Sequence, residues 1–210
     1  MKYIKIPPAT INRLSIYSRK LGVLIQEGLD VVSSEKLANE CGVNSAQLRK
    51  DLAYFGEFGV RGVGYYTETL LQHIKKILGL EKEWRLGLFG VGNLGQALLH
   101  YPNFVKQGYR FVAAFDVDPA KIGQTIGSGL PISHVKDVAE VINREPFEIG
   151  VITTPADQAK RVADLAIRAG VKGLLNFAPV ILQVPGNIIV EHVDFTIKLD
   201  CISYYLTTRG

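Results

Sequence analysis

Three glycines and one acidic residue have the spacing of a dinucleotide-binding site. Gly90, Gly92 and Gly95 form a G-x-G-x-x-G turn between an apolar strand and a helix, and Asp116 ends the next apolar strand. The first glycine permits the tight turn, the second lets a pyrophosphate approach the backbone, and the third lets helix and strand pack closely. The helix N-terminus then offers unpaired N–H groups to the phosphates. We therefore expect the whole turn to bind a cofactor: Gly90, Val91, Gly92, Asn93, Leu94 and Gly95.

Asp116 indicates which dinucleotide binds. A carboxylate at this position accepts hydrogen bonds from the hydroxyls of the adenosine ribose and repels a 2′-phosphate. The predicted cofactors are therefore NADH and NAD+ rather than their 2′-phosphorylated forms. The alternative is a loop whose glycines serve only tight turns.

The segments that follow have the pattern of a doubly wound sheet. Apolar runs predict strands over residues 148–154, 173–177 and 188–193, and residues 157–169 predict a helix. Thr153 and Thr154 end the first of these strands, at the edge where ligands bind in such sheets. The alternative is that these threonines and Pro155 form only a turn.

The first 79 residues have the spacing of a helix-turn-helix. Apolar periodicity predicts four helices, over residues 10–27, 34–41, 45–55 and 66–79. Ser33 and Asn44 can cap the second and third helices, and Gly42 between them can adopt the positive φ that a tight turn needs. Leu48 faces the core at the position that the motif requires.

A glycine-rich stretch after the third helix predicts a hairpin wing. Residues 56–66 place glycines between β-branched and aromatic residues, with Arg61 at or near the expected tip. The third helix begins with short polar side chains, which would let it enter a major groove. The predicted DNA contacts come from this helix and the wing: Ser45, Gln47, Arg49, Lys50 and Arg61. The alternative for the same helices is a dimerisation module.

Charge and composition limit the function classes. The chain has 24 Lys+Arg and 20 Asp+Glu, and its net charge of +4 resides entirely in residues 1–79. This division favours a nucleic-acid partner for that part. The sequence lacks an apolar run long enough to span a membrane and the apolar run of a signal peptide. Cys41 and Cys201 have no metal or redox spacing. We expect a cytoplasmic protein with no membrane partner and no metal.

The C-terminal segment carries an apolar stripe. Asp194 can cap a helix over residues 194–206, on which Phe195, Leu199, Ile202 and Leu206 share one face. A short helix with such a stripe must bury it on something. An apolar lid over a nicotinamide would favour NADH, because NAD+ carries a fixed positive charge that is costly to bury.

Several long motifs resemble the Rex family of redox-sensing transcriptional repressors. They cover nearly the whole chain and lie in residues 6–14, 46–59, 61–65, 90–95, 115–118, 176–179 and 192–194. One departure is Pro8, which stands where a polar residue is common in the family. The resemblance implies a homodimer that binds palindromic operator DNA and leaves it when NADH binds.

The same resemblance implies roles that spacing alone leaves open. Thr153, Thr154 and Asn176 would lie near the nicotinamide, although Asn176 could instead cap its strand. The terminal helix would be exchanged between subunits, which would bring Phe195 closest to the nicotinamide unless that ring is plain dimer core. Tyr101 would also lie at the cofactor. The predicted link between ring occupancy and the DNA domains consists of Arg13, Tyr101 and Asp194.

The predicted fold class is therefore α/β, with three parts. A winged helix-turn-helix domain spans residues 1–79, a Rossmann-like NAD(H)-binding domain spans 80–192, and a domain-swapped helix spans 193–210. Two alternatives are an NAD-dependent oxidoreductase and a nucleotide- or CoA-binding subunit with an extra helical domain. An enzyme needs a general acid or base beside the nicotinamide. None of the four histidines supplies one convincingly, so we expect no catalytic residues: His73, His100, His134 and His192.

Overall fold

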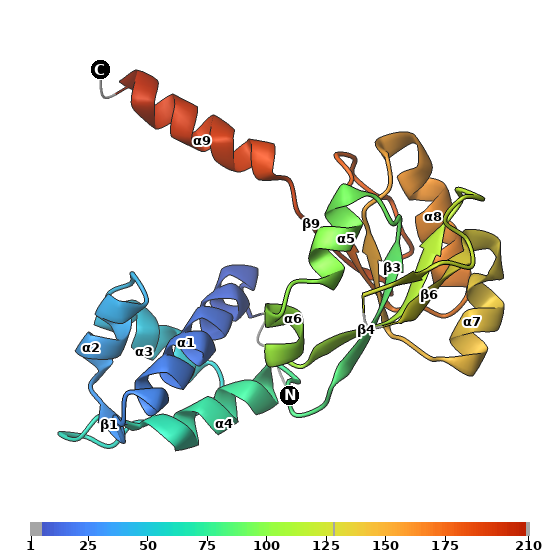
Figure 1. Ribbon diagram of the computed structural model, residues 1–210. Helices are drawn as coiled ribbons and strands as arrows, with labels where there is room; N and C mark the ends of the chain where they lie inside the picture. The colour runs from blue at the N-terminus through green and yellow to red at the C-terminus, as the bar shows by residue number, and fades with distance from the viewer. Residues whose placement is uncertain (1–5, 128, 209–210) are drawn as a thin grey trace. The chain divides into compact units, whose positions relative to one another are not determined.

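The chain divides into two compact units, each with its own core. The computed structural model describes residues 6–127 and 129–208. The division between unit 1 and unit 2 falls between Lys82 and Glu83, three residues after the boundary expected from the sequence. Figure 1 traces the elements of each unit along the chain.

Unit 1 contains the four expected helices and a two-stranded sheet. Its elements are α1 (Pro8–Gln26), β1 (Val31–Val32), α2 (Ser34–Glu40), α3 (Ser45–Ala53), β2 (Tyr65–Tyr66) and α4 (Thr67–Ile77). Helix α1 begins two residues before the predicted start, because a proline fits the first turn of a helix, where its missing N–H needs no partner. Apolar side chains from all four helices form one core: Leu14, Tyr17, Leu21, Leu37, Leu48, Leu52, Leu70 and Ile74.

The turn between α2 and α3 forms as the sequence predicts. The Ser33 hydroxyl accepts a hydrogen bond from the Lys36 N–H at 3.1 Å, and the side-chain amide oxygen of Asn44 accepts one from the Gln47 N–H at 2.7 Å. Gly42 has a φ of +69°, which suits glycine. Both caps and the helix-turn-helix geometry are confirmed.

The wing contains less strand than predicted. In the described chain its own pairing is a single bridge between Val60 and Gly64, while β2 pairs antiparallel with β1. A Cβ on Gly64 would lie 2.4 Å from the Val32 carbonyl oxygen, and the φ of Gly64 is +115°. The second half of the wing therefore joins the α1–α2 link, which leaves residues 60–64 as a short projecting loop.

Unit 2 is built on a doubly wound sheet. Its strands are β3 (Trp84–Phe89), β4 (Tyr109–Asp116), β5 (Thr125–Ile126), β6 (Leu130–His134), β7 (Ile149–Ile152), β8 (Gly173–Asn176) and β9 (Ile189–His192). Over the described residues the order is β5-β6-β4-β3-β7-β8-β9, and only the β5–β6 pair is antiparallel. The chain reverses its direction of winding between β3 and β7. In such sheets ligands bind at the carboxyl ends of the strands at this reversal.

Helices cover both faces of this sheet (Figure 1). Residues Leu86 and Leu88 of β3 pack on the face that carries α5 (Asn93–Leu99) and α6 (Asn103–Lys106). Phe89 points to the opposite face, which carries the 3-10 turn η1 (Val135–Asp137), α7 (Val138–Arg144) and α8 (Ala156–Arg168). Phe89 stacks on Phe115 at 4.9 Å between ring centroids. Two buried faces explain why the buried stretches of the central strands, residues 86–89 of β3 and 112–115 of β4, are apolar.

The last helix buries none of its residues within the chain. Helix α9 (Phe195–Thr208) starts one residue after the predicted position, and the Asp194 carboxylate accepts a hydrogen bond from the Thr196 N–H at 2.8 Å. The predicted cap is therefore confirmed. Its large apolar side chains are between 55% and 73% exposed: Phe195, Ile197, Leu199, Ile202, Tyr204, Tyr205 and Leu206. The apolar stripe is thus uncovered by the described part of this chain.

Candidate dinucleotide site and DNA interface

The glycine turn has the shape that a pyrophosphate requires. Gly90 has a φ of +98°, and a Cβ on Gly95 would lie 2.2 Å from the Gly90 carbonyl oxygen. A Cβ on Gly92 would meet no heavy atom within 4 Å among the described residues. Gly92 is also the N-cap of α5 and supplies no side-chain cap, and Gly92, Asn93 and Leu94 are all exposed. Gly90 and Gly95 therefore serve the turn itself, while Gly92 leaves room for a ligand.

Asp116 lies at the carboxyl end of β4 with its carboxylate 9% exposed. One oxygen accepts hydrogen bonds from the N–H groups of Val117 and Asp118, at 2.8 and 3.0 Å. The other accepts from the Val91 N–H at 2.8 Å and from the Lys121 ammonium at 3.2 Å. Burial opposes ionisation, but the hydrogen bonds outweigh it and lower the pKa of Asp116. The group is a carboxylate at neutral pH, and its roughly four lone-pair sites are all in use.

Thr153 and Thr154 flank the turn from the end of β7. The Thr153 hydroxyl donates to the Gly90 carbonyl at 2.7 Å, so it holds the turn closed. The buried hydroxyl of Thr154 has no hydrogen-bond partner within the described chain. A buried polar group without a partner is costly, which makes this hydroxyl suited to a ligand beside Gly90. The open space at Gly92 and this orphan hydroxyl fit a dinucleotide at the site.

Asn176, at the end of β8, is fully buried and engaged by its neighbours. Its amide nitrogen lies 3.0 Å from the Ala178 carbonyl oxygen, 2.8 Å from the Val180 carbonyl oxygen and 3.1 Å from Nδ1 of His192. Its amide oxygen accepts the Ala178 N–H at 3.0 Å. These contacts favour the alternative in which Asn176 caps its strand and shapes the next loop. A direct contact with the nicotinamide remains a prediction.

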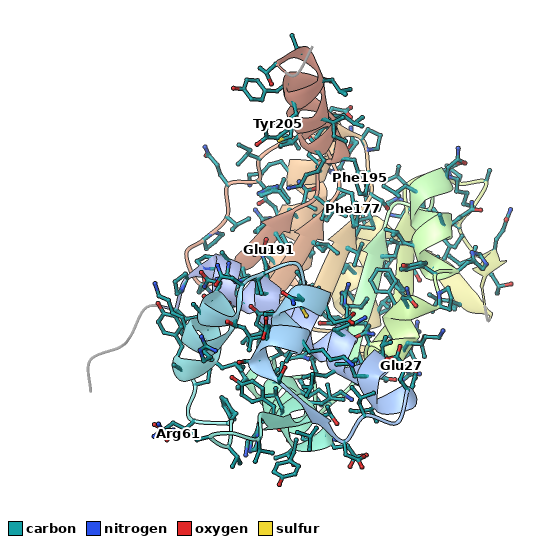
Figure 2. The ribbon with its side chains drawn as sticks, turned by 90° about the vertical axis from the view of Figure 1, so that its left-hand side faces the viewer. Glu27, Arg61, Phe177, Glu191, Phe195 and Tyr205 are labelled. Carbon is teal, nitrogen blue, oxygen red and sulfur yellow. The ribbon has the colours of Figure 1, made fainter. Side chains whose placement is uncertain are left out.

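The structure places Phe195 and Tyr101 at different parts of unit 2. Phe195 packs on Phe177, which directly follows β8, with 6.2 Å between ring centroids (Figure 2). Tyr101, just after α5, is 51% exposed and packs edge-to-face on Phe104. The cavity that Tyr101 lines contains no residue of the glycine turn. This conformation therefore does not bring Tyr101 together with the predicted phosphate site.

The exposed side of α3 carries the predicted DNA contacts unequally. Arg49 and Lys50 are exposed, whereas Ser45 and Gln47 are partly buried at its flanks. Arg49 donates a hydrogen bond to the Ser34 hydroxyl at 3.0 Å, and both residues line a groove that runs between α3 and the wing. Arg61 lines the same groove and lies exposed at the wing tip (Figure 2). Glu57 also lines this groove, so its charged side chains are two arginines and one acid. A groove with a net positive charge beside a helix and a wing is suited to a DNA backbone.

Arg13 is engaged within unit 1. Its guanidinium binds the Asp51 carboxylate through two nitrogens, at 2.6 and 2.7 Å. Asp51 lies on α3 and is completely buried. Asp51 was not predicted as a functional residue, although an acid between the core positions Leu48 and Leu52 is a signal for a buried partner. A role of Arg13 in a link to Asp194 stays a prediction. In this structure the Arg13 guanidinium is already paired with Asp51.

These features define a class of protein: a winged-helix DNA-binding unit joined to a Rossmann-like dinucleotide-binding unit. Two family models match the two units. Residues 5–53 match one described as "Putative DNA-binding protein N-terminus", and residues 81–180 match one described as "CoA binding domain".

Full-length relatives identify the family. The chain is 57% identical over 207 residues to the redox-sensing transcriptional repressor Rex of Syntrophobacter fumaroxidans, with 99% of each chain covered. It is 50% identical to the protein of the same name from Carboxydothermus hydrogenoformans, with 97% of this chain and 98% of the relative covered. The chain belongs to the Rex family of redox-sensing transcriptional repressors.

Solved structures support the same assignment. RSP, a Rex-family repressor, has been crystallised in complex with β-NAD+ and operator DNA, and that chain is 37% identical to ours with a TM-score of 0.92. The match covers 97% of this chain and 94% of RSP. RSP in complex with β-NADH matches with a TM-score of 0.87 and 36% identity, over 98% of this chain and 96% of RSP. The predicted two-unit α/β fold is confirmed, and the oxidoreductase and CoA-subunit alternatives are not favoured.

Residues 6–127 and 129–208 contain neither a candidate membrane span nor a candidate metal site. None of their helices is long and apolar enough to cross a membrane. No group of three or more His, Cys, Asp or Glu side chains in residues 6–127 and 129–208 could hold a metal ion.

Burial raises the pKa of the Cys41 thiol to about 11, so this thiol is protonated and a poor nucleophile at neutral pH.

Proposed function

We propose that this chain is a homodimeric repressor that binds a palindromic operator and leaves it when NADH binds. The observation that carries the proposal is that one chain holds both a basic groove between helix and wing and an open phosphate turn. The family name and the RSP complexes with operator DNA, β-NAD+ and β-NADH support both halves. We expect no catalytic activity, and we expect the protein to act in the cytoplasm, where both ligands are present.

In this proposal the ribose displaces Lys121 from Asp116. Three of the four donors on Asp116 are backbone N–H groups that hold the turn, so they stay in place. The ammonium of Lys121 is the longest contact, and its side chain is 35% exposed, so it can move. Asp116 then accepts one ribose hydroxyl at the lone pair that Lys121 releases, and the displaced ammonium donates to the other.

Selectivity for NADH comes from an apolar cover over the nicotinamide. NAD+ has a fixed charge on that ring, and burying an unpaired cation is costly. Phe195 supplies the cover, and Thr154 supplies a hydroxyl that lacks a partner within the described chain. The exposed stripe of α9 is buried by a second copy of the chain, which makes the cover a contribution of the partner subunit. Arg13, Tyr101 and Asp194 couple the covered ring to the DNA-binding units.

Titration of operator binding with NADH at fixed NAD+ tests the proposal. The operator site and the NADH site bias the same equilibrium, between the DNA-bound and the released conformation of the dimer. Operator DNA should therefore weaken NADH binding by the same factor by which NADH weakens operator binding. A shift from 1:99 to 99:1 needs a preference of about 5.5 kcal/mol, or about 2.7 kcal/mol for each of two ligands. Operator binding that is indifferent to NADH contradicts the proposal.

Substitutions in the groove test the DNA interface. We expect Arg49→Ala and Arg61→Ala to weaken operator binding, while Arg161→Ala, an exposed arginine on α8, leaves it unchanged. A contact to phosphate alone lowers affinity for operator and random DNA alike, whereas a base contact lowers the operator-to-random ratio at one position. Unchanged affinity of both groove variants for both DNAs contradicts this interface.

Removal of residues 194–210 tests the cover. We expect the truncated chain to retain part of its dinucleotide binding, to lose the preference of NADH over NAD+ in operator release, and to dimerise more weakly. A truncated chain that still dimerises and still leaves DNA only with NADH shows that α9 is not the sensor.

A further inference from the structure

Unit 1 contains a buried carboxylate that the proposed function leaves without a role. Asp51 is 0% exposed and accepts five hydrogen bonds. The Thr10 hydroxyl donates at 3.0 Å, the Tyr17 hydroxyl at 2.8 Å, and the Gln47 amide at 2.9 Å, in addition to the two bonds from Arg13. Burial opposes ionisation, yet the hydrogen bonds from Arg13, Tyr17, Thr10 and Gln47 hold the pKa of Asp51 at about 2. The group is a fully paired anion inside the DNA-binding unit.

Three of the four donors form one stripe on α1. Thr10, Arg13 and Tyr17 are three and four residues apart, which places them on the same face of a helix. Asp51 lies on α3, so the carboxylate joins this stripe to the helix that carries Arg49 and Lys50. The two basic side chains point out while Asp51 points in, because adjacent residues on a helix are about 100° apart.

Apolar packing alone does little to fix the rotation of α3 about its own axis. The helix has nine residues, and Leu48 and Leu52 are its buried apolar side chains. Apolar contacts are non-directional, so leucine packing tolerates small rotations of a helix about its axis. Four of the five hydrogen bonds to the Asp51 carboxylate come from α1. Hydrogen bonds are directional, so a rotation of α3 on α1 would break several of these four at once.

Gln47 extends this arrangement to the outer flank of α3. Its amide nitrogen donates to Asp51, and the side chain is partly exposed. One amide N–H is thereby fixed, which leaves the second N–H and the carbonyl oxygen in a defined direction. Those two groups are the pair that a glutamine uses to bind adenine in a major groove.

We infer that Asp51 is a positioning residue for operator recognition, which fixes the rotation of α3 on α1 and the orientation of the Gln47 amide. Asp51 touches no DNA itself, because it is buried. The inference rests on the proposed operator binding. If the unaltered chain fails to bind an operator, the proposed function fails; if it binds and Asp51 has no effect on discrimination, only this inference fails.

The test is the ratio of operator to random-DNA affinity in the full-length protein. We expect Asp51→Asn, which keeps the side-chain shape but removes the charge, to lower this ratio by about tenfold or more. Glu68→Gln, an exposed acid on α4 in the same unit, is the matched control and should leave the ratio unchanged. Glu68→Gln should also leave NADH affinity within about twofold, because Glu68 lies in unit 1 and outside the proposed link of Arg13, Tyr101 and Asp194.

Tyr17→Phe is a milder second variant, which tests the inference even if Asp51→Asn fails to fold. It removes one neutral donor and leaves the Arg13–Asp51 pair, so the unit should remain folded while the ratio falls a few-fold. Gln47→Ala completes a double-mutant cycle. If Asp51 orients Gln47, the effect of Gln47→Ala on the ratio should shrink in the Asp51→Asn or Tyr17→Phe background.

A merely structural Asp51 gives a different pattern. Thermal stability would fall, but the folded variants would keep the operator-to-random ratio within about twofold, and the effects of Tyr17→Phe and Gln47→Ala would add independently. That result would overturn the inference.

Discussion

Each unit holds one buried aspartate at its functional end, and the two carboxylates are satisfied in different ways. Asp51 in unit 1 accepts only side-chain donors, from α1 and from its own helix. Asp116 in unit 2 accepts three backbone N–H groups and one ammonium. Both have a pKa below the ordinary value of an aspartate.

The difference decides what each carboxylate can do. The donors of Asp51 are spread over helices, so the acid fixes one helix on another and leaves no lone pair for a ligand. Most donors of Asp116 belong to the loop it organises, and the remaining one, Lys121, is a flexible and partly exposed side chain. A ligand can replace that donor without disturbing the loop. Asp116 can therefore bind a ligand because one of its donors, Lys121, can move away, whereas Asp51 has no such donor and can only position α3.

The largest effect should come from Asp116→Ala. The variant loses the charge-assisted hydrogen bond from Asp116 to the ribose, about 1.5–3 kcal/mol, and it leaves the Val91 N–H without its partner. We expect NADH affinity to fall about 100-fold or more, measured by calorimetry, and a repressor that stays on operator DNA in the presence of NADH. Operator affinity without NADH should not change. NADH binding equal to that of the unaltered chain would show that Asp116 organises its loop without contacting the ligand.

Gly92→Ala and Gly95→Ala separate binding from folding within the same loop. A methyl group on Gly92 meets open space in the protein but occupies the place of the phosphates, so NADH should bind roughly tenfold more weakly with no change in Tm. A methyl group on Gly95 would collide with the Gly90 carbonyl, so unit 2 itself should be destabilised. The fluorescence of Trp84, the one tryptophan of the chain, follows unfolding of unit 2. Equal loss of Tm in the two variants would refute the assignment of Gly92 to the ligand.

Acid should weaken unit 1 through Asp51. Its folded pKa of about 2 lies below the ordinary value of 3.8, so its contribution to stability is complete above about pH 4 and is lost as the pH falls toward about 2. The lost contribution is about 2 kcal/mol. Urea unfolding, followed by helical circular dichroism at pH 5 and pH 3, should show a smaller pH dependence for Asp51→Asn than for the unaltered chain. Identical pH dependence in the two proteins would mean that Asp51 is not held as an anion by its partners.

The smallest effect should come from Lys121→Met. The ammonium partly neutralises Asp116, which softens the repulsion between this carboxylate and a 2′-phosphate. Its removal should raise the preference for NADH over NADPH by a few-fold, on the order of 0.5–1 kcal/mol as for other partly exposed ion pairs. Competitive binding of the two dinucleotides measures the preference. A lower preference in the variant would show that the hydrogen bond from Lys121 to the ribose favours NADH more than its charge favours a 2′-phosphate.

The sequence by itself determined the features that depend on a few neighbouring residues. The caps at Ser33 and Asn44, the turn at Gly42 and the G-x-G-x-x-G turn each depend on local backbone geometry, which a residue type either permits or forbids. The apolar periods of the helices and of β3, β4 and β7 also predicted the two units and their order. The strands β5 and β6 and the helices α6 and α7 were not predicted from the sequence, and β5 has only two residues, which carry no period.

Only the tertiary structure decided which side chains meet. Thr10, Arg13 and Tyr17 lie 34 to 41 positions from Asp51, and Val91 lies 25 positions from Asp116. The position of Asp51 between Leu48 and Leu52 is a signal for burial, but its actual burial depends on how α1 crosses α3, which the local sequence does not specify. Likewise, the occupied lone pairs of Asp116, the engaged amide of Asn176 and the uncovered stripe of α9 follow from packing. Hydrogen bonds between distant residues form only after apolar packing has brought their helices and strands together, so sequence spacing does not encode them.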